Sequence, residues 1–291
     1  MERAIIPPPW LDRREFPFAP HTFHHPHGRM HYVDEGSGPV ILFVHGTPEW
    51  SFGFRHLVRA LSATHRCIVP DHRGFGLSDK PANADLTVAA HARRLHDFID
   101  HLGLKDLVLV VTDFGGGIGL QHALTRPDHV RGIVLYNTWM WPLDDDPRFA
   151  RPARIARSWL GRLLYLRLGF SVNVLMPSAY ADKKKLTRHV HAHYKRALPD
   201  ARSRMATHVL ACELLDAAPF WAGQWRQVER LRTIPTLIAW GMKDRFVPPD
   251  LLERWRQALP QARVVPIADA GHFVHEEDPA ALIEAITSLL S

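Results

Sequence analysis

The stretch VTDFGGGIGL, residues 111–120, decides the fold. It places a carboxylate, Asp113, between an apolar, strand-like run, LVLVVTD at 107–113, and glycines that begin a helical stretch. A strand that passes directly into a helix holds the residue between them on a tight turn, with its side chain above the sheet and small residues on either side. The positive end of the following helix favours a carboxylate there. Asp113 is therefore interpreted either as a nucleophile on such a turn or as a residue that caps the helix.

The rest of the chain alternates short β-branched runs with helical stretches, which is typical of βαβ units and a mostly parallel, doubly wound sheet. A helical, basic and aromatic segment at 140–225 interrupts this alternation. We therefore predict an α/β fold whose core consists of residues 1–139 and 226–291, with 140–225 inserted as a helical cap, or lid.

Conspicuous polar residues stand at the carboxyl ends of the predicted strands, where ligands bind in open parallel sheets. They are His45, Asp71, Asp113, Asn137, Asp244 and His272. His272 could reach Asp113 as a base, and Asp244 could accept a ring N–H of His272 and fix its orientation. Asparagine cannot carry a charge, so Asp244 is preferred to position 137 as the acid. Asp71 and Asp269 are interpreted as structural or turn residues.

Five motifs together resemble those of the α/β-hydrolase family across nearly the whole chain: HGTPEW, PDHRGFGLSDKP, VTDFGG, GMKD and AGHF. The order of Asp113, Asp244 and His272 along the chain is also the nucleophile, acid and base order of that family. With an aspartate in the nucleophile position, this motif resembles that of haloalkane dehalogenases and epoxide hydrolases. The stretches PPPWLDRREFPF, GRMHYVDEG and NTWMWPL look more like the dehalogenases.

This resemblance implies an α/β-hydrolase fold and hydrolysis of a small apolar haloalkane to an alcohol and a halide ion. A carboxylate is ionised at neutral pH without help, so Asp113 can displace a halide and form an alkyl ester. His272 would activate the water that hydrolyses the ester, and backbone N–H groups of Thr47 and Phe114 would hold the oxyanion. The reaction requires no metal and no cofactor. The bend of the HGxP loop predicts a cis Thr47–Pro48 bond.

One position departs from the dehalogenase pattern, since these enzymes usually follow the nucleophile with a tryptophan whose N–H helps to bind the halide. Here that position is Phe114, and a buried halide without a donor would be costly. Side chains that could replace the missing donor, or else simply pack in the core and the cap, are Trp50, Trp139, Trp141, Asn173 and Trp221.

Two other functions remain open. An epoxide hydrolase needs cap tyrosines that protonate the ring oxygen, and the candidates in this segment are Tyr165, Tyr180 and Tyr194. A non-catalytic, ligand-binding homologue is also possible, because a fold does not determine a function.

The 291-residue chain has 46% hydrophobic and 23% charged residues, an ordinary globular composition. Its formal charge is +6, and residues 144–225 carry the whole excess, with 14 Lys and Arg against 7 Asp and Glu. This excess indicates either a solvated helical surface or a positive potential that attracts anions. No recognition motif accompanies it, so nucleic acid is not an expected partner.

The sequence also predicts a cytoplasmic protein without a membrane partner, and it leaves the oligomeric state open. No apolar run approaches the ~20 residues that cross a bilayer, and no secretory signal is evident. The basic stretch 151–168 resembles a membrane-surface helix, but its apolar face is expected to cover the pocket. Histidines cluster at 21–31 and 189–193 without the spacing of a metal site, and Cys67 and Cys212 form no CxxC pair.

Overall fold

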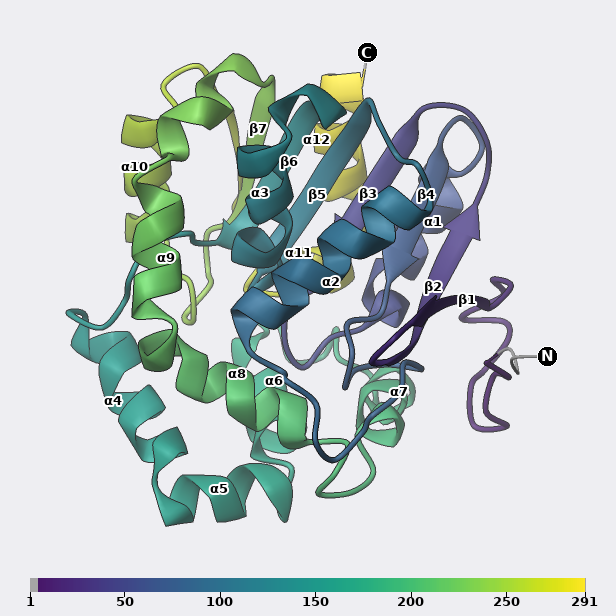
Figure 1. Cartoon of the computed structure of the whole chain (residues 1–291), viewed down its shortest axis with the longest axis vertical. Coiled ribbons are helices and arrows are strands. Elements are labelled where there is room, and N and C mark those ends of the chain that lie inside the picture. The colour runs from purple at the N-terminus through teal and green to yellow at the C-terminus, as the bar shows by residue number, and fades with distance from the viewer. Residues whose placement is uncertain (1–4, 291) are drawn as a thin grey trace.

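The computed structural model describes residues 5–290, in which a mostly parallel sheet carries helices on both faces (Figure 1). Within these residues the sheet has eight strands in the order β1-β2-β4-β3-β5-β6-β7-β8. β2 runs antiparallel to its neighbours β1 and β4, and the other pairings are parallel. The strands are β1 (His21–His25), β2 (Gly28–Glu35), β3 (Val40–Val44), β4 (Arg66–Pro70), β5 (Leu107–Asp113), β6 (Val130–Thr138), β7 (Thr236–Gly241) and β8 (Arg263–Ile267). The predicted doubly wound α/β fold is confirmed.

Helices α2 and α3 cover one face of the sheet, and α12 lies behind the other (Figure 1). After the HGTPEW motif a short 3₁₀ turn, Ser51–Phe54, precedes α1, which begins at Arg55. The helices are α1 (Arg55–Leu61), α2 (Val88–His101), α3 (Gly115–Thr125), α4 (Pro147–Arg157), α5 (Trp159–Leu166), α6 (Met176–Ala179), α7 (Arg188–Ala197), α8 (Met205–Asp216), α9 (Ala218–Trp225), α10 (Asp250–Ala258), α11 (Val274–Glu277) and α12 (Pro279–Leu290).

Local sequence explains the central elements. Every residue of β5 is buried, as expected for a Leu- and Val-rich strand that is covered on both faces. α2 begins where the Thr87 side chain accepts a hydrogen bond from the backbone N–H of Ala90, and it turns Leu95, Phe98 and Ile99 towards the sheet. These elements position the end of β5, and therefore Asp113, near the middle of the sheet.

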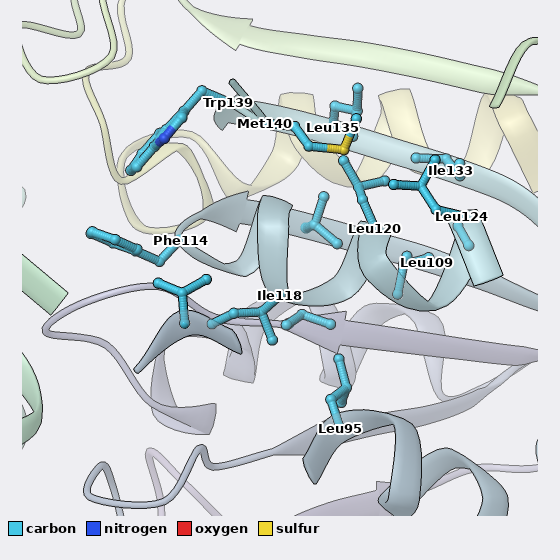
Figure 2. Close-up of a cluster of buried hydrophobic side chains, with 14 of the residues drawn as sticks. Leu95, Leu109, Phe114, Ile118, Leu120, Leu124, Ile133, Leu135, Trp139 and Met140 are labelled. Atoms are coloured by element: carbon cyan, nitrogen blue, oxygen red, sulfur yellow. The ribbon is translucent and has the colours of Figure 1, made fainter. Parts of the chain in front are cut away.

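The segment between β6 and β7 is helical. It contains α4 to α9, and Figure 1 shows α4, α5 and α8 grouped at one end of the molecule while α9 runs beside α3. A cluster of buried apolar side chains extends from α3 along β5 and β6 to Phe114 and Trp139, next to the start of this helical segment (Figure 2). The carboxyl ends of β5 and β6 therefore lie next to the start of the helical segment.

Candidate active site

Asp113 lies on the turn between β5 and α3 with a backbone φ of 48°, a conformation that costs energy for a residue other than glycine. A Cβ atom at Gly115 would collide with the carbonyl oxygen of Val44 in β3, so this turn can approach the neighbouring strand only with glycine there. The hydroxyl of Thr138 donates a 2.6 Å hydrogen bond to the carbonyl of Asp113. The turn is therefore held from two neighbouring strands.

The carboxylate of Asp113 is buried and makes different contacts through its two oxygens. Oδ2 accepts a 2.7 Å hydrogen bond from the backbone N–H of Thr47, and the backbone N–H of Phe114 also lowers the pKa of this carboxyl. Oδ1 lies 3.8 Å from Nε2 of His272, which is beyond hydrogen-bond distance. Oδ1 therefore remains available to an incoming carbon atom.

His272 is held by Asp244. Nδ1 of His272 lies 2.8 Å from Oδ2 of Asp244, and because a carboxylate only accepts, Nδ1 donates and Nε2 is left towards Asp113. The other oxygen of Asp244 accepts backbone hydrogen bonds of 2.7 Å from Phe246 and 3.0 Å from Val247. The structure thus brings together Asp113, Asp244 and His272, which come from three separate segments of the chain.

Asn137 has a structural part in this arrangement that the sequence did not reveal. Its φ is 41°, and its amide nitrogen donates a 2.8 Å hydrogen bond to Oδ2 of Asp244. The same side chain bonds to both backbone groups of Gly241, at 2.8 and 3.2 Å. Asn137 therefore orients the carboxylate of Asp244.

Burial and charge shift the pKa of both titrating groups. Burial raises the pKa of Asp113 to about 6, against the opposing effects of His272 and of the backbone N–H groups. Burial alone would lower the pKa of His272, but the charge and hydrogen bond of Asp244, helped by Asp113, raise it to about 9. The resting site therefore favours a protonated imidazole next to a carboxylate.

A cavity of about 120 Å³ lies above these residues. Asp113 and His272 form one wall, and side chains from α4, α5, the turn at 171–175, α6 and α8 form the other. The lining is mainly apolar and includes Phe149, Leu175, Met176, Leu214, Val247 and Phe273. Sequence reasoning missed these residues because their apolar pattern does not distinguish a pocket wall from ordinary core packing. A cavity of this kind accepts a small, mostly apolar molecule.

Of the five side chains proposed for the halide site, only Trp139 lines this cavity. Trp50 packs among Trp10, Phe16 and Phe52. Trp141 stacks edge-on against Trp225 and Trp255, and Asn173 is exposed and donates to the carbonyl of Leu168. Trp221 is buried behind Phe114 and already donates its indole N–H to the carbonyl of Glu213. The set of candidate donors is thereby reduced to Trp139.

Trp139 and Thr47 share an unusual feature. Both line the cavity, and the buried Nε1 of Trp139 and Oγ1 of Thr47 have no hydrogen-bond partner within residues 5–290. The ring of Trp139 meets that of Phe114 edge-on, with centroids 5.0 Å apart, at the end of the apolar cluster (Figure 2). Unsatisfied buried donors of this kind are uncommon in native proteins and require an explanation.

The HGTPEW loop contributes one further buried group that sequence reasoning missed, Glu49. Oε1 of Glu49 lies 2.6 Å from Nε2 of His275, whose Nδ1 is 3.0 Å from the hydroxyl of Tyr136. Burial alone would raise the pKa of Glu49, but the facing His275 lowers it. The position of Glu49 beside Pro48 in the HGTPEW motif was the available signal. The Thr47–Pro48 peptide bond is cis, as predicted.

The remaining predicted side chains are distributed as follows. Asp71 is buried and accepts hydrogen bonds from the backbone of Ser51 and Leu77, a structural position, and Asp269 pairs with Lys243 at the surface. Among the three cap tyrosines, Tyr165 lines the cavity, whereas Tyr194 donates to Glu276, and Tyr180 packs on Phe273.

Neither histidine cluster nor any other group in the described part of the chain brings together three or more side chains able to hold a metal ion. Among residues 5–290 there is also no helix long and apolar enough to span a membrane.

The comparisons agree with this geometry. A family model described as the alpha/beta hydrolase fold matches residues 39–279, and the chain belongs to that family. Within it the chain is haloalkane dehalogenase-like. It is 38% identical to Haloalkane dehalogenase 2 of Mycobacterium tuberculosis, over 94% of this chain and 96% of that protein.

Two further relatives extend the comparison. The chain is 31% identical to the cis-3-alkyl-4-alkyloxetan-2-one decarboxylase of Shewanella oneidensis, over 94% of this chain and 89% of that protein. The solved structure of a putative ancestral haloalkane dehalogenase is 27% identical, with a TM-score of 0.84 over 92% of this chain and 97% of the other.

Proposed function

We propose that the protein is a haloalkane dehalogenase in which Asp113 is the nucleophile, His272 the general base and Asp244 the acid that orients it. In the first step a lone pair of Asp113 Oδ1 forms a bond to the carbon of the haloalkane. The carbon–halogen bond breaks in the same step, and the halide leaves with its electron pair. The observation that supports this most directly is the free Oδ1, which faces an apolar cavity from a turn that constrains the backbone.

The second step hydrolyses the ester on Asp113. Water gives a proton to Nε2 of His272 and adds to the carboxyl carbon, and the resulting oxyanion receives hydrogen bonds from the backbone N–H groups of Thr47 and Phe114. Collapse breaks the bond between the carboxyl carbon and the alkoxy oxygen, and the alcohol leaves with the proton that His272 Nε2 took from water. The proton of the added hydroxyl is lost to solvent, and Asp113 is restored as a carboxylate. Esterification also removes the negative charge that helps to raise the pKa of His272, which favours the neutral base when it is needed.

We propose that the indole N–H of Trp139 and the hydroxyl of Thr47 bind the departing halide. Both atoms are buried and line the cavity that contains Asp113, and neither has a partner within the described chain. A halide accepts hydrogen bonds and would satisfy both donors, which compensates for the phenyl ring of Phe114. Residues 140–225 would act as the cap that excludes water from this site.

The experiment that tests the proposed function is a trapping experiment with the His272→Gln variant. Treated with 1-bromobutane, this variant should release one equivalent of bromide and retain a butyl group, which peptide mass mapping should locate on Asp113. The Asp113→Asn/His272→Gln double variant is the matched control and should gain no mass. Absence of both adduct and bromide with bromo-, iodo- and chloroalkanes would overturn the proposal.

Two substrate arms separate this function from its alternatives. Turnover of styrene oxide by the unmodified protein, without halide release from any haloalkane, would indicate an epoxide hydrolase. Release of carbon dioxide from a cis-3-alkyl-4-alkyloxetan-2-one would instead indicate the reaction named for the Shewanella oneidensis relative. An inactive protein that binds these molecules unchanged would be a non-catalytic homologue.

A further inference from the structure

The outer surface of the cap exposes an unusual number of large apolar side chains. Among the residues that the structure describes, seven large hydrophobic side chains are exposed, and six of them lie between positions 155 and 174. They are Ile155, Trp159, Leu160, Leu163, Leu168 and Val174, and the indole of Trp159 is 79% exposed. The apolar face of 151–168 was expected to cover the pocket. That expectation is wrong for Ile155 of α4, for Trp159, Leu160 and Leu163 of α5 and for Leu168, which are exposed, whereas Tyr165 of α5 lines the cavity.

The segment that carries this apolar surface contains charges of one sign only. Residues 147–181 contain six arginines and no Asp or Glu. Arg148 pairs with Asp146 and Asp250, and Arg157 pairs with Asp216. The other four, Arg151, Arg154, Arg162 and Arg167, are exposed and have no ion-pair partner within residues 5–290. The outer face of α4 and α5 therefore combines exposed apolar groups with unneutralised positive charge.

A groove of about 540 Å³ lies on the same surface, between α5 and the start of α8. Trp159, Leu163 and Met205 form its apolar part, and Arg162, Arg167 and Arg202 stand around it. Figure 1 shows α5 at the end of the molecule remote from the sheet, so this surface can meet a flat partner without obstruction from the core. The groove can hold the acyl chain of a lipid while the anionic headgroup of that lipid contacts the arginines.

We propose that the outer face of α4 and α5 binds the surface of an anionic phospholipid membrane. An indole with exposed leucines suits the boundary between headgroups and acyl chains, and the surrounding arginines suit anionic headgroups. A second copy of the chain fits this face poorly, because a symmetric contact would place the same unpaired arginines opposite one another. The membrane partner excluded by the sequence analysis is therefore proposed as a peripheral contact, without a spanning helix.

Membrane binding through α5 would serve the proposed function, and this part of the inference rests on that function. Trp159, Leu160 and Leu163 on the outside of α5 and Tyr165 on its cavity side belong to the same short helix. Docking α5 on a bilayer would place the cap pocket next to the phase in which small apolar haloalkanes dissolve. The membrane contact itself does not depend on the reaction, so vesicle binding tests it even if the proposed function fails.

The test is co-sedimentation of the full chain with vesicles of equal parts phosphatidylcholine and phosphatidylglycerol. The unmodified protein should bind these vesicles, bind pure phosphatidylcholine much less, and lose binding as salt rises. The Arg154→Gln/Arg162→Gln variant should lose about five-fold in partition for each arginine removed. The Trp159→Ala/Leu163→Ala variant should lose about ten-fold or more.

Matched controls lie outside this face. Ile6→Ala removes the remaining exposed large apolar side chain of the described residues, and Arg256→Gln removes an exposed arginine of α10, and neither should change binding. All variants should keep the thermal unfolding midpoint of the parent. No binding by the unmodified protein, or binding by both cap double variants equal to that of the unmodified protein, would overturn the proposal. A different result would also overturn it: the unmodified protein forms a dimer in sedimentation equilibrium, the cap double variants do not, and none of them binds vesicles. That result would assign the face to a second copy of the chain.

Discussion

The two sides of Asp113 are built differently. On the side of His272, the carboxylate of Asp244 is fully engaged: it accepts from Nδ1 of His272, from Asn137 and from two backbone N–H groups. On the side of Trp139, two buried polar atoms have none within the described residues. Hydrogen bonds within the protein hold the first side. Under the proposed function, the two unpartnered donors of the second side would receive the leaving halide, whereas the groups around His272 are preorganised.

The strongest way to break the preorganised side is Asp244→Asn. The amide would offer an N–H where an acceptor is needed, so the tautomer and orientation of His272 should be lost and turnover should fall by about 10⁴. Steady-state halide release measures the effect. The control is Asp269→Asn, since Asp269 pairs with Lys243 at the surface, and it should leave the rate unchanged. A loss below ten-fold would contradict the role proposed for Asp244.

The other side should be broken by Trp139→Phe or Thr47→Val. Each removes one halide donor, and each should lower kcat/KM for haloalkanes by about 10–100-fold while turnover of styrene oxide, if present, stays constant. Trp221→Phe is the matched control, because the indole N–H of Trp221 already donates to the backbone carbonyl of Glu213 and Trp221 does not line the cavity. Adding Phe114→Trp to Trp139→Phe should recover part of the loss. An unchanged halide rate in both single variants would remove these residues from the leaving-group site.

The two steps of the proposed reaction, formation and hydrolysis of the ester, should depend differently on pH. Asp113 must be ionised to form the ester, so single-turnover halide release should fall about ten-fold for each unit below a pKa of about 6. His272 must be neutral to hydrolyse the ester, so hydrolysis should rise with pH up to a pKa that lies below about 9, because the ester has removed the charge of Asp113. Rapid-quench measurement of both steps tests this, and identical profiles would contradict it.

The smallest effect should be one of stability. The raised pKa of Asp113 means that the folded state holds this proton more tightly than the unfolded state, so folding loses stability as pH rises from about 4 to about 6. Asp113→Asn should therefore raise the free energy of unfolding by on the order of 1 kcal/mol above that window and leave it unchanged below it. Urea unfolding at both ends of the window measures this. Asp145→Asn, at an exposed position, serves as the control.

Much of the site could be predicted because it depends on residue types at strand ends. A carboxylate before GGG, a histidine after Gly271 and an aspartate after β7 are local signals, and a parallel sheet brings their strand ends to one edge. The sequence did not predict which tryptophan lines the cavity. Trp50, Trp139 and Trp221 are all buried, and only side-chain packing decides which indole faces a cavity and which donates to a carbonyl.

The sequence by itself therefore determined the fold, the turn that holds Asp113 and the three residues proposed to act together, since each follows from periodicity and short-range motifs. Only the tertiary structure decided the partners of those residues. It assigned Asn137 to Asp244, left Trp139 and Thr47 without partners, and turned Trp159 outward from the cap. The physical reason is that hydrogen-bond satisfaction and exposure depend on contacts between segments far apart in the chain, which local pattern does not specify.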